Sequence, residues 1–120
     1  MARILLADDD KGTLDLVRRA LELDGHTVTT CDDGTDALAQ LKSASIFDVL
    51  VSDVQMPGLD GVTLAGEALA LHPGIRLVLM SAYAEVLDTA RGLGAGSIRL
   101  LTKPFPIERV RAEVRAALGA

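Results

Sequence analysis

The run ILLADDDKG, residues 4–12, decides the fold because four apolar residues lead directly into three aspartates. A continuous apolar run of this kind is typical of a parallel strand that is covered on both faces. Adjacent carboxylates repel one another, and an unpaired buried carboxylate is costly or takes up a proton. The run is therefore either a solvated turn or one side of a site that holds a positive charge.

Four further segments complete a predicted set of strands. Val49–Val51 and Leu77–Met80 are continuous apolar runs like Ile4–Ala7, so these three strands are expected inside the sheet. His26–Cys31 is half polar, and Ser97–Thr102 carries Arg99 in its middle. Mixed strands of this kind are expected at the two edges of a sheet.

Apolar residues at helical spacing separate and follow these strands. The resulting order is (βα)5, which with right-handed crossovers predicts a doubly wound α/β fold of the flavodoxin-like type. Its five-stranded parallel sheet is expected in the order 2-1-3-4-5, with ligands binding at the carboxyl ends of the strands. The predicted helices centre on Leu14–Leu21, Ala37–Leu41, Val62–Leu69, Glu85–Leu93 and Ile107–Leu118.

Length and composition indicate one ordinary globular domain over residues 1–120. The net charge of −5 disfavours direct nucleic-acid binding, which depends on neutralising phosphates. No apolar run approaches the roughly 20 residues that span a bilayer, and the N-terminus does not read as a signal peptide, so we expect a cytoplasmic protein without a membrane partner. The single cysteine, Cys31, is expected to pack on a strand, and His26 and His72 are expected to be solvated.

The acidic residues at two strand ends predict a metal site. Asp8 and Asp9 follow the first strand, and Asp53 follows the third, which would be its neighbour in the sheet. Three carboxylates without a nearby nitrogen or sulfur ligand suit a hard cation, most simply Mg²⁺. Asp10 and Asp60 are instead expected to begin helices.

Two further polar residues end the remaining strands. Ser81 follows the fourth strand and Lys103 the fifth, so both are expected at the same edge as Asp53. A carboxylate nucleophile beside Mg²⁺, a hydroxyl and an ammonium group is the set that acceptance of a phosphoryl group requires.

The order of these motifs resembles a response-regulator receiver domain, the CheY-like family of two-component signalling, over the whole chain. The residues that carry the resemblance are Asp8-Asp9, Asp53, Met56-Pro57-Gly58, Asp60-Gly61, Ser81-Ala82 and Lys103-Pro104-Phe105.

The resemblance implies a role for each site residue. Asp53 would accept the phosphoryl group, while Asp9 directly, Asp8 through water and the backbone carbonyl of Gln55 would help to hold Mg²⁺. Ser81 would move toward the phosphoryl group, and Lys103 would pair with Asp53 at rest. Such a protein catalyses only its own phosphorylation and dephosphorylation, and its donor is a sensor histidine kinase or a histidine phosphotransfer protein. The Lys103-Pro104 bond is expected to be cis.

The resemblance draws attention to two positions, one that departs from the family pattern and one that in this family influences the lifetime of the phosphoryl group. Leu100 stands where the family usually has a tyrosine or phenylalanine, so the usual coupling of the hydroxyl to an aromatic ring is in doubt. Tyr83, two residues after Ser81, is bulky and is expected to slow loss of the phosphoryl group.

Output is expected through the face that the family uses for partner binding, formed by its fourth helix, fifth strand and fifth helix. Here that face is Glu85–Leu93, Ser97–Leu101 and Ile107–Leu118, with Arg109, Arg111 and Arg115 on the outer side of the last helix. A weaker resemblance to CpdR-like single-domain receivers makes a protease of the ClpXP type one candidate partner. Other possible outputs are a contact with a flagellar motor and an intermediate role in a phosphorelay. Alternatively, the chain is a receiver cut from a larger regulator or hybrid kinase.

Two other classes stay open at this point. Haloacid-dehalogenase-like phosphatases also use an aspartate nucleophile with Mg²⁺, but they need a second aspartate where this chain has Gln55. A degenerate receiver that only binds partners would not need the acidic residues, Ser81 and Lys103 that are present.

Overall fold

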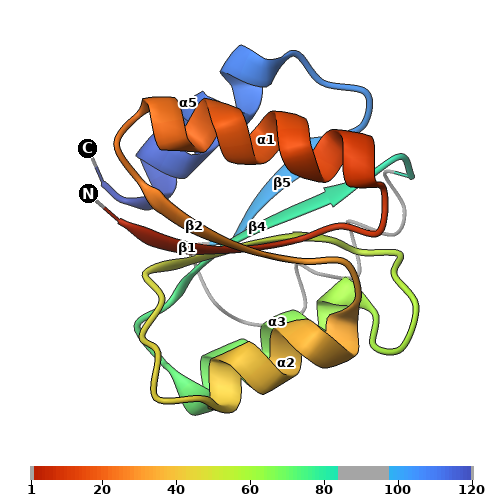
Figure 1. The fold of residues 1–120 in the computed structure, drawn as a ribbon, viewed down its shortest axis with the longest axis vertical. Helices are drawn as coiled ribbons and strands as arrows, with labels where there is room; N and C mark the ends of the chain where they lie inside the picture. The colour runs from red at the N-terminus through yellow and green to blue at the C-terminus, as the bar shows by residue number, and fades with distance from the viewer. Residues whose placement is uncertain (1, 84–97, 120) are drawn as a thin grey trace.

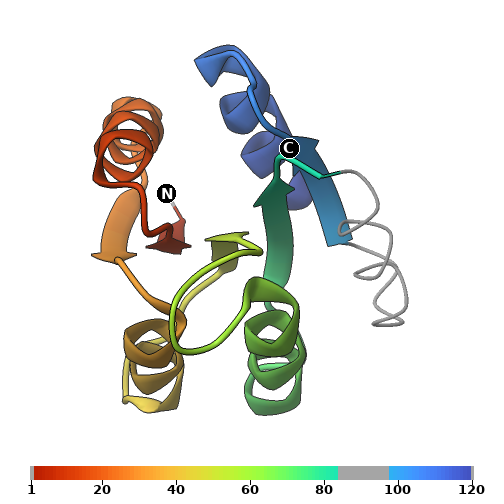
Figure 2. The same ribbon diagram turned by 90° about the vertical axis from the view of Figure 1, so that its right-hand side faces the viewer.

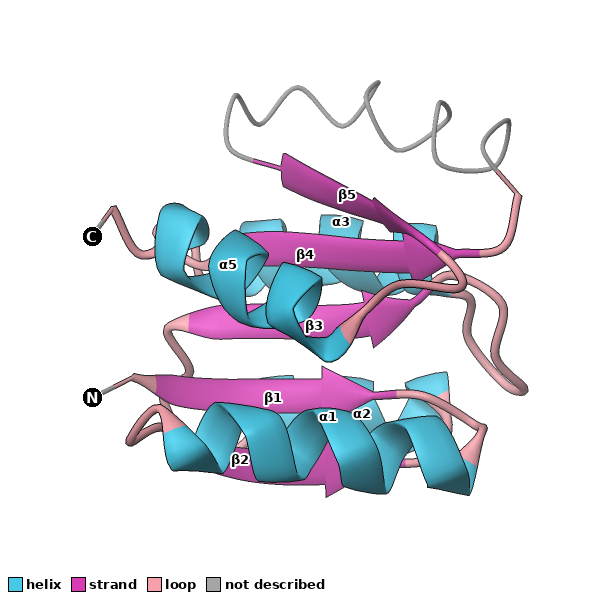
Figure 3. Cartoon of the chain, turned by 90° about the horizontal axis from the view of Figure 1, so that it is seen from above, coloured by secondary structure: helices cyan, strands magenta, loops and turns pink. Residues whose placement is uncertain are grey.

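A computed structural model of the chain describes residues 2–83 and 98–119. The described residues form one parallel sheet in the order β2-β1-β3-β4-β5 (Figure 3), which confirms the predicted fold and strand order. The predicted edge strands lie at the two edges, and no strand bound differs from its prediction by more than two residues. The strands are β1 (Arg3–Ala7), β2 (Thr27–Cys31), β3 (Val49–Asp53), β4 (Arg76–Ser81) and β5 (Ile98–Thr102).

The described helices cover both faces of the sheet. Helices α1 and α5 lie on one face and α2 and α3 on the other (Figures 1 and 2). The helix predicted over Glu85–Leu93 lies outside the described residues. None of the helices in the described ranges has the length and apolar character needed to cross a bilayer. Their bounds are α1 (Lys11–Leu23), α2 (Gly34–Lys42), α3 (Gly61–Leu71) and α5 (Ile107–Ala117).

The core consists of two aliphatic layers, one on each face of the sheet. Along β1, Leu5 packs in the layer beneath α2 and α3, whereas Ile4 and Leu6 pack in the layer beneath α1 and α5. All three side chains are fully buried. Burial on both faces explains why this strand reads as a continuous apolar run rather than an alternating one.

Aspartates begin three of the helices. Asp10 caps α1 by accepting a hydrogen bond from the Gly12 backbone, Asp33 caps α2, and Asp60 caps α3 by accepting from the Thr63 backbone. Each cap satisfies a backbone N–H that the first helical turn leaves without a partner. The structural roles predicted for Asp10 and Asp60 are therefore confirmed.

An ion-pair network joins α1 to α5. The Arg111 guanidinium donates to the carboxylate of Asp24, which ends α1, and to Glu108 one turn earlier in α5. Arg115 lies 4.0 Å from the same Asp24 carboxylate. Arg111 is therefore half-buried between the two helices, whereas Arg109 and Arg115 are exposed, as expected for the outer side of α5.

Candidate phosphoacceptor site

The carboxyl edge of the sheet brings the predicted site residues together from four strands. Asp8 follows β1 directly, Asp53 ends β3, Ser81 ends β4 and Lys103 follows β5. Strands β1 and β3 are hydrogen-bonded neighbours at the point where the winding of the sheet reverses. This is the position where doubly wound folds bind their ligands.

Three carboxylates cluster at this edge as the sequence predicted. Asp8, Asp9 and Asp53 each offer an oxygen, and these oxygens lie within 4.8 Å of one another. Asp8 and Asp53 are buried, whereas Asp9 is exposed and open to solvent on one side. An all-oxygen set of this kind, buried at its base and open at its mouth, fits a hydrated Mg²⁺ ion.

Lys103 supplies a positive charge to the same cluster. Its Nζ lies 3.0 Å from Oδ2 of Asp8 and 3.3 Å from Oδ2 of Asp53. Partial burial opposes the charge on Lys103, but the hydrogen bond and charge of Asp8, followed by those of Asp53, raise its pKa. The lysine therefore stays protonated and neutralises part of the negative charge of the site.

Asp53 has an environment that resists ionisation. Burial raises its pKa; the charge of Lys103 opposes this effect and that of Asp8 adds to it. When two buried carboxylates lie side by side, a cation bound between them stabilises their charged forms. The carboxylate of Asp53 is thus poorly solvated, and a cation held close to it would stabilise its charged form.

Hydrogen bonds fix Asp8 at the end of β1. Its Oδ1 accepts from the backbone N–H of Asp10 at 2.9 Å, and its own N–H donates to the carbonyl of Cys31 at 3.2 Å. Asp8 is therefore held through its side chain at the start of α1 and through its backbone at the end of β2.

Ser81 ends β4, the strand next to Asp53, and Gln55 follows Asp53 along the chain. Ser81 is buried, and its Oγ accepts a hydrogen bond from the backbone N–H of Tyr83 at 3.1 Å. Gln55 is exposed, two residues after Asp53 in the loop that follows β3. The tyrosine ring is half exposed, and Leu100, at the usual aromatic position, packs partly buried against the core layer on the α2 and α3 face.

Backbone geometry beside Lys103 positions the lysine. Its N–H donates to the carbonyl of Ser81 at 2.8 Å, which continues the pairing of β5 with β4 beyond the end of the strand. The Lys103-Pro104 peptide bond is cis, as predicted.

One residue that supports the site, Gly61, was named from the sequence only as part of the Asp60-Gly61 motif and was expected to have a structural role at a helix start. A Cβ atom on Gly61 would lie 2.2 Å from the carbonyl oxygen of Asp53 and 2.8 Å from Cα of Val54. The start of α3 therefore packs directly on the backbone of the predicted nucleophile. The only signal in the sequence is the pair Asp60-Gly61 at a helix start, which by itself indicates a cap and not a close contact.

The comparisons with known proteins agree with this geometry. A doubly wound sheet with an acidic cluster and a lysine at its switch point defines a flavodoxin-like α/β domain of CheY-like type. The model of the response regulator receiver domain family matches residues 4–115. The chain therefore belongs to the response regulator receiver domain family.

The chain spans half or less of the length of the two curated relatives named here. The response regulator MprA of Mycobacterium ulcerans (strain Agy99) is 36% identical over 97% of this chain, which spans 50% of that protein. The C4-dicarboxylate transport transcriptional regulatory protein DctD of Rhizobium meliloti (strain 1021) is 32% identical over 95% of the chain and 25% of that protein. A CheY-like receiver domain protein from Methanospirillum hungatei JF-1 superposes with a TM-score of 0.88 at 26% identity, over 99% of this chain and 94% of that one.

Proposed function

We propose that the chain accepts a phosphoryl group on Asp53 from a sensor histidine kinase or a histidine phosphotransfer protein of a two-component system, in the presence of Mg²⁺. The observation that carries this proposal is the position of Lys103 Nζ within 3.3 Å of two buried carboxylates, Asp8 and Asp53. A buried acid pair with a lysine is costly to maintain for stability alone.

In the proposed reaction, an oxygen of the Asp53 carboxylate attacks the phosphorus atom of phosphohistidine. A new O–P bond forms, the P–N bond breaks, and the bonding electron pair stays on the imidazole nitrogen. The product is an aspartyl phosphate on this chain and a free histidine on the donor. Hydrolysis of the aspartyl phosphate releases inorganic phosphate and restores the free carboxylate of Asp53.

The other site residues stabilise the charge that this transfer brings. Asp8, Asp9, Asp53 and the backbone carbonyl of Gln55 would hold Mg²⁺. When bound, the ion would supply positive charge that offsets the charge of the phosphoryl group. The ammonium group of Lys103 leaves Asp53 and pairs with a phosphoryl oxygen, and the hydroxyl of Ser81 donates a hydrogen bond to another.

An apolar groove beside the acid cluster supports a protein as donor. The groove has a volume of about 310 Å³ and lies between the start of α1 and the segment that follows β5. Leu16 is 58% exposed there, and Phe105 and Ile107 face it from the other side. A helix that carries phosphohistidine would bury this apolar surface while it presents the phosphoryl group to Asp53.

Output is proposed through partner binding at the face that includes β5 and α5. In the described part of this face, Arg99 of β5 pairs with Glu113 of α5 at 3.3 Å. Because Leu100 lacks a ring, movement of Ser81 would be transmitted by the segment that follows it. The partner is an output protein, of which a protease of the ClpXP type is one candidate, or a further domain of a longer regulator, as the coverage of the curated relatives suggests.

A phosphatase of the haloacid-dehalogenase type is a weaker alternative. Such an enzyme needs an acidic residue two positions after its nucleophile, and the chain has the amide Gln55 there. The amide of Gln55 cannot act as the general acid that protonates a leaving alcohol in such enzymes.

The proposal is tested by incubating the protein with acetyl phosphate and measuring its intact mass with and without Mg²⁺. We expect one phosphoryl group on the wild-type chain with Mg²⁺, none on Asp53→Asn, and an unchanged yield on Asp36→Asn, which removes an exposed carboxylate on α2. A protein that takes up no phosphoryl group under any of these conditions would be a degenerate receiver. Turnover of acetyl phosphate without a labelled protein would favour the phosphatase.

A further inference from the structure

Strand β2 forms an open edge of the sheet. It pairs with β1 on one side and is the first strand in the sheet order. Its sequence, TVTTC, consists mainly of β-branched residues and contains no proline, glycine or charged residue. Charged residues and proline are two of the features that protect natural edge strands from pairing with another chain. The opposite edge strand, β5, has Arg99 at its centre.

The hydrogen bonds to β1 show which backbone groups of β2 face outward. The N–H of Thr27 donates to the carbonyl of Ala2 at 2.9 Å, and the carbonyl of Cys31 accepts from the N–H of Asp8 at 3.2 Å. Backbone groups in a strand point alternately to either side. The N–H and C=O groups of Val28 and Thr30 therefore point away from β1, toward the open edge.

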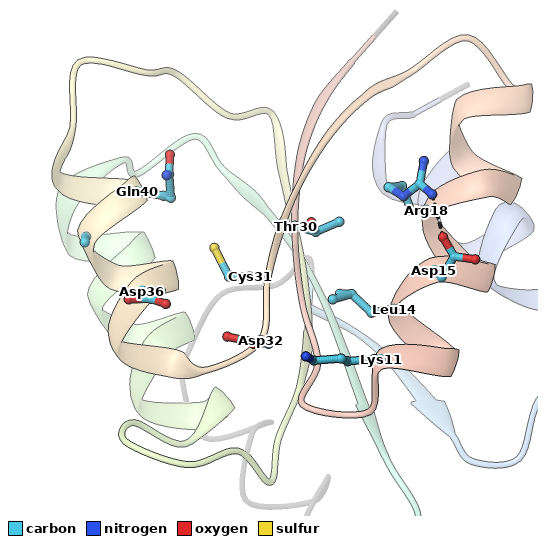
Figure 4. A pocket seen from close by; sticks show the side chains of 10 residues that line it. Lys11, Leu14, Asp15, Arg18, Thr30, Cys31, Asp32, Asp36 and Gln40 are labelled. Carbon is cyan, nitrogen blue, oxygen red and sulfur yellow. Dashed lines mark hydrogen bonds and ion pairs between the residues drawn. The ribbon is translucent and has the colours of Figure 1, made fainter.

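A groove of about 570 Å³ runs along this edge between two helices. Figure 4 shows β2 in the middle, with α1 on one side and α2 on the other. Thr30 points toward α1, and the thiol of Cys31 points toward α2. The edge strand is thus the floor of a groove with helical walls. The α1 wall is formed by Lys11, Leu14, Asp15 and Arg18, and the α2 wall by Asp32, Asp36, Ala39 and Gln40.

The two walls differ in charge. On the α2 side, Asp32 and Asp36 line the groove, and together with Asp33 they offer carboxylate oxygens within 4.8 Å of one another. On the α1 side, Lys11 and Arg18 outnumber Asp15, to which Arg18 is bound. An extended chain lying on β2 would present alternate side chains to these two walls.

We propose that the open edge of β2 binds an extended peptide segment of a partner protein as an added strand, with basic side chains toward the α2 wall and acidic side chains toward the α1 wall. This inference goes beyond the proposed phosphoacceptor function and does not depend on it. Backbone hydrogen bonds to Val28 and Thr30 would supply affinity, and the charged walls would supply specificity.

The shape of the groove favours a bare strand over a second copy of the chain. In a second copy, helices α1 and α2 flank the same edge of its own β2 strand. Pairing of the two edges would therefore bring the like-charged α2 walls, with Asp32 and Asp36, or the helices of both copies against one another. A single extended segment has no such walls of its own.

A designed peptide provides the probe for this proposal. The peptide acetyl-Thr-Lys-Glu-Val-Glu-Lys-Thr-amide places its lysines on one face of a strand and its glutamates on the other. Because it reads the same in both directions, it fits parallel or antiparallel addition. Binding is followed by amide NMR spectra of the isotope-labelled protein and by the anisotropy of a labelled peptide.

We expect saturable binding, with the largest shifts at the amides of Val28, Thr30 and Lys11. The double variant Asp32→Asn/Asp36→Asn should weaken binding roughly three- to tenfold, whereas Glu67→Gln on α3 should leave it unchanged. Thr30→Pro removes one outward N–H and leaves the pairing with β1 in place, so it should weaken binding by about fivefold or more.

A peptide that is N-methylated at its central residues tests the backbone contacts on the unchanged protein. The N-methylated peptide should not bind the wild-type protein. This result stays informative even if Thr30→Pro fails to fold. The proposal is wrong if the unmodified peptide does not bind at about 1 mM, if the N-methylated peptide binds equally well, or if the shifts lie away from β2. Dimerisation of the protein alone that Thr30→Pro abolishes would also overturn it, because the edge would then belong to a second copy.

Discussion

Lys103 bridges two buried carboxylates, and its Nζ lies nearer to Oδ2 of Asp8, at 3.0 Å, than to Oδ2 of Asp53, at 3.3 Å. The side chain of Asp8 is fully buried, and that of Asp53 is 9% exposed. The lysine therefore holds an acid pair together, and is not reserved for the predicted nucleophile alone.

Replacing Lys103 with methionine should destabilise the metal-free protein. The change leaves two buried carboxylates facing each other without a cation, so the free energy of unfolding should fall by about 3 kcal/mol. Added Mg²⁺ should recover part of this loss, because an ion that binds only the folded state stabilises it. Urea unfolding with and without Mg²⁺ measures both effects. Lys42→Met, at an exposed position of α2, is the control, and an equal loss in both variants would show that Lys103 has no such role.

The close contact of Gly61 predicts a large effect for a very small substitution. In Gly61→Ala the new methyl group would meet backbone atoms of Asp53 and Val54, which cannot rotate away. We expect a loss of about 2 kcal/mol in stability and a slower phosphorylation of Asp53. Gly74→Ala is the matched control, because a Cβ atom there meets no heavy atom within 4 Å. Chemical denaturation measures the free energy of unfolding of both variants. An equal loss in Gly61→Ala and Gly74→Ala would contradict the account.

The lifetime of an aspartyl phosphate should depend on the ring of Tyr83. This ring is 50% exposed, and its backbone N–H is hydrogen-bonded to Oγ of Ser81. We expect the ring to shield the phosphoryl group from attacking water, so that Tyr83→Ala loses phosphate several times faster and Tyr83→Phe at about the wild-type rate. The measurement is the decay of phosphorylated protein after the donor is removed. Fast decay that is the same in all three proteins would exclude shielding by Tyr83.

The stability of the protein should fall in mildly acidic solution because of His26. Its Nδ1 accepts a hydrogen bond from the backbone N–H of Ala2 at 3.1 Å, which requires an unprotonated nitrogen. Burial lowers the pKa of His26 from its ordinary value of 6.5, and the charge of Asp24 opposes this effect only in part.

The unfolded chain therefore binds a proton more readily than the folded chain between the lowered pKa and 6.5. Over this range the free energy of unfolding should decrease as the pH falls. In His26→Asn, the amide oxygen can accept the same hydrogen bond without titrating, and the slope should be smaller. Thermal unfolding at a series of pH values measures the slope, and identical slopes in the two proteins would contradict the assignment.

The strands could be predicted because each depends on a short-range pattern, and the acidic cluster could be predicted because it follows from the expected order of those strands. Residues 4–7 read as apolar because both faces of β1 are covered, and the carboxyl ends of parallel strands necessarily share one edge. Once the strand order was deduced, Asp8 and Asp53 had to lie close together. Nothing more than periodicity and topology was needed for this part of the site.

Other contacts depend on packing that no local pattern records. A sequence shows that Lys103 reaches the acidic edge, but not that it lies nearer to Asp8. His26 was expected to be solvated because it follows a glycine. In the structure its Nδ1 instead accepts a hydrogen bond from the backbone N–H of Ala2, just before β1. The contact of Gly61 with Asp53 likewise needs the path of the loop between β3 and α3.

The most direct test of the central claim is to locate the phosphoryl group on the chain. Protein treated with acetyl phosphate and Mg²⁺ is reduced with borohydride, which converts an aspartyl phosphate into homoserine, and is then mapped by peptide mass spectrometry. The account predicts homoserine at position 53 and at no other aspartate. Homoserine at Asp8 or Asp9, or an unmodified Asp53 in protein that has taken up phosphate, would contradict it.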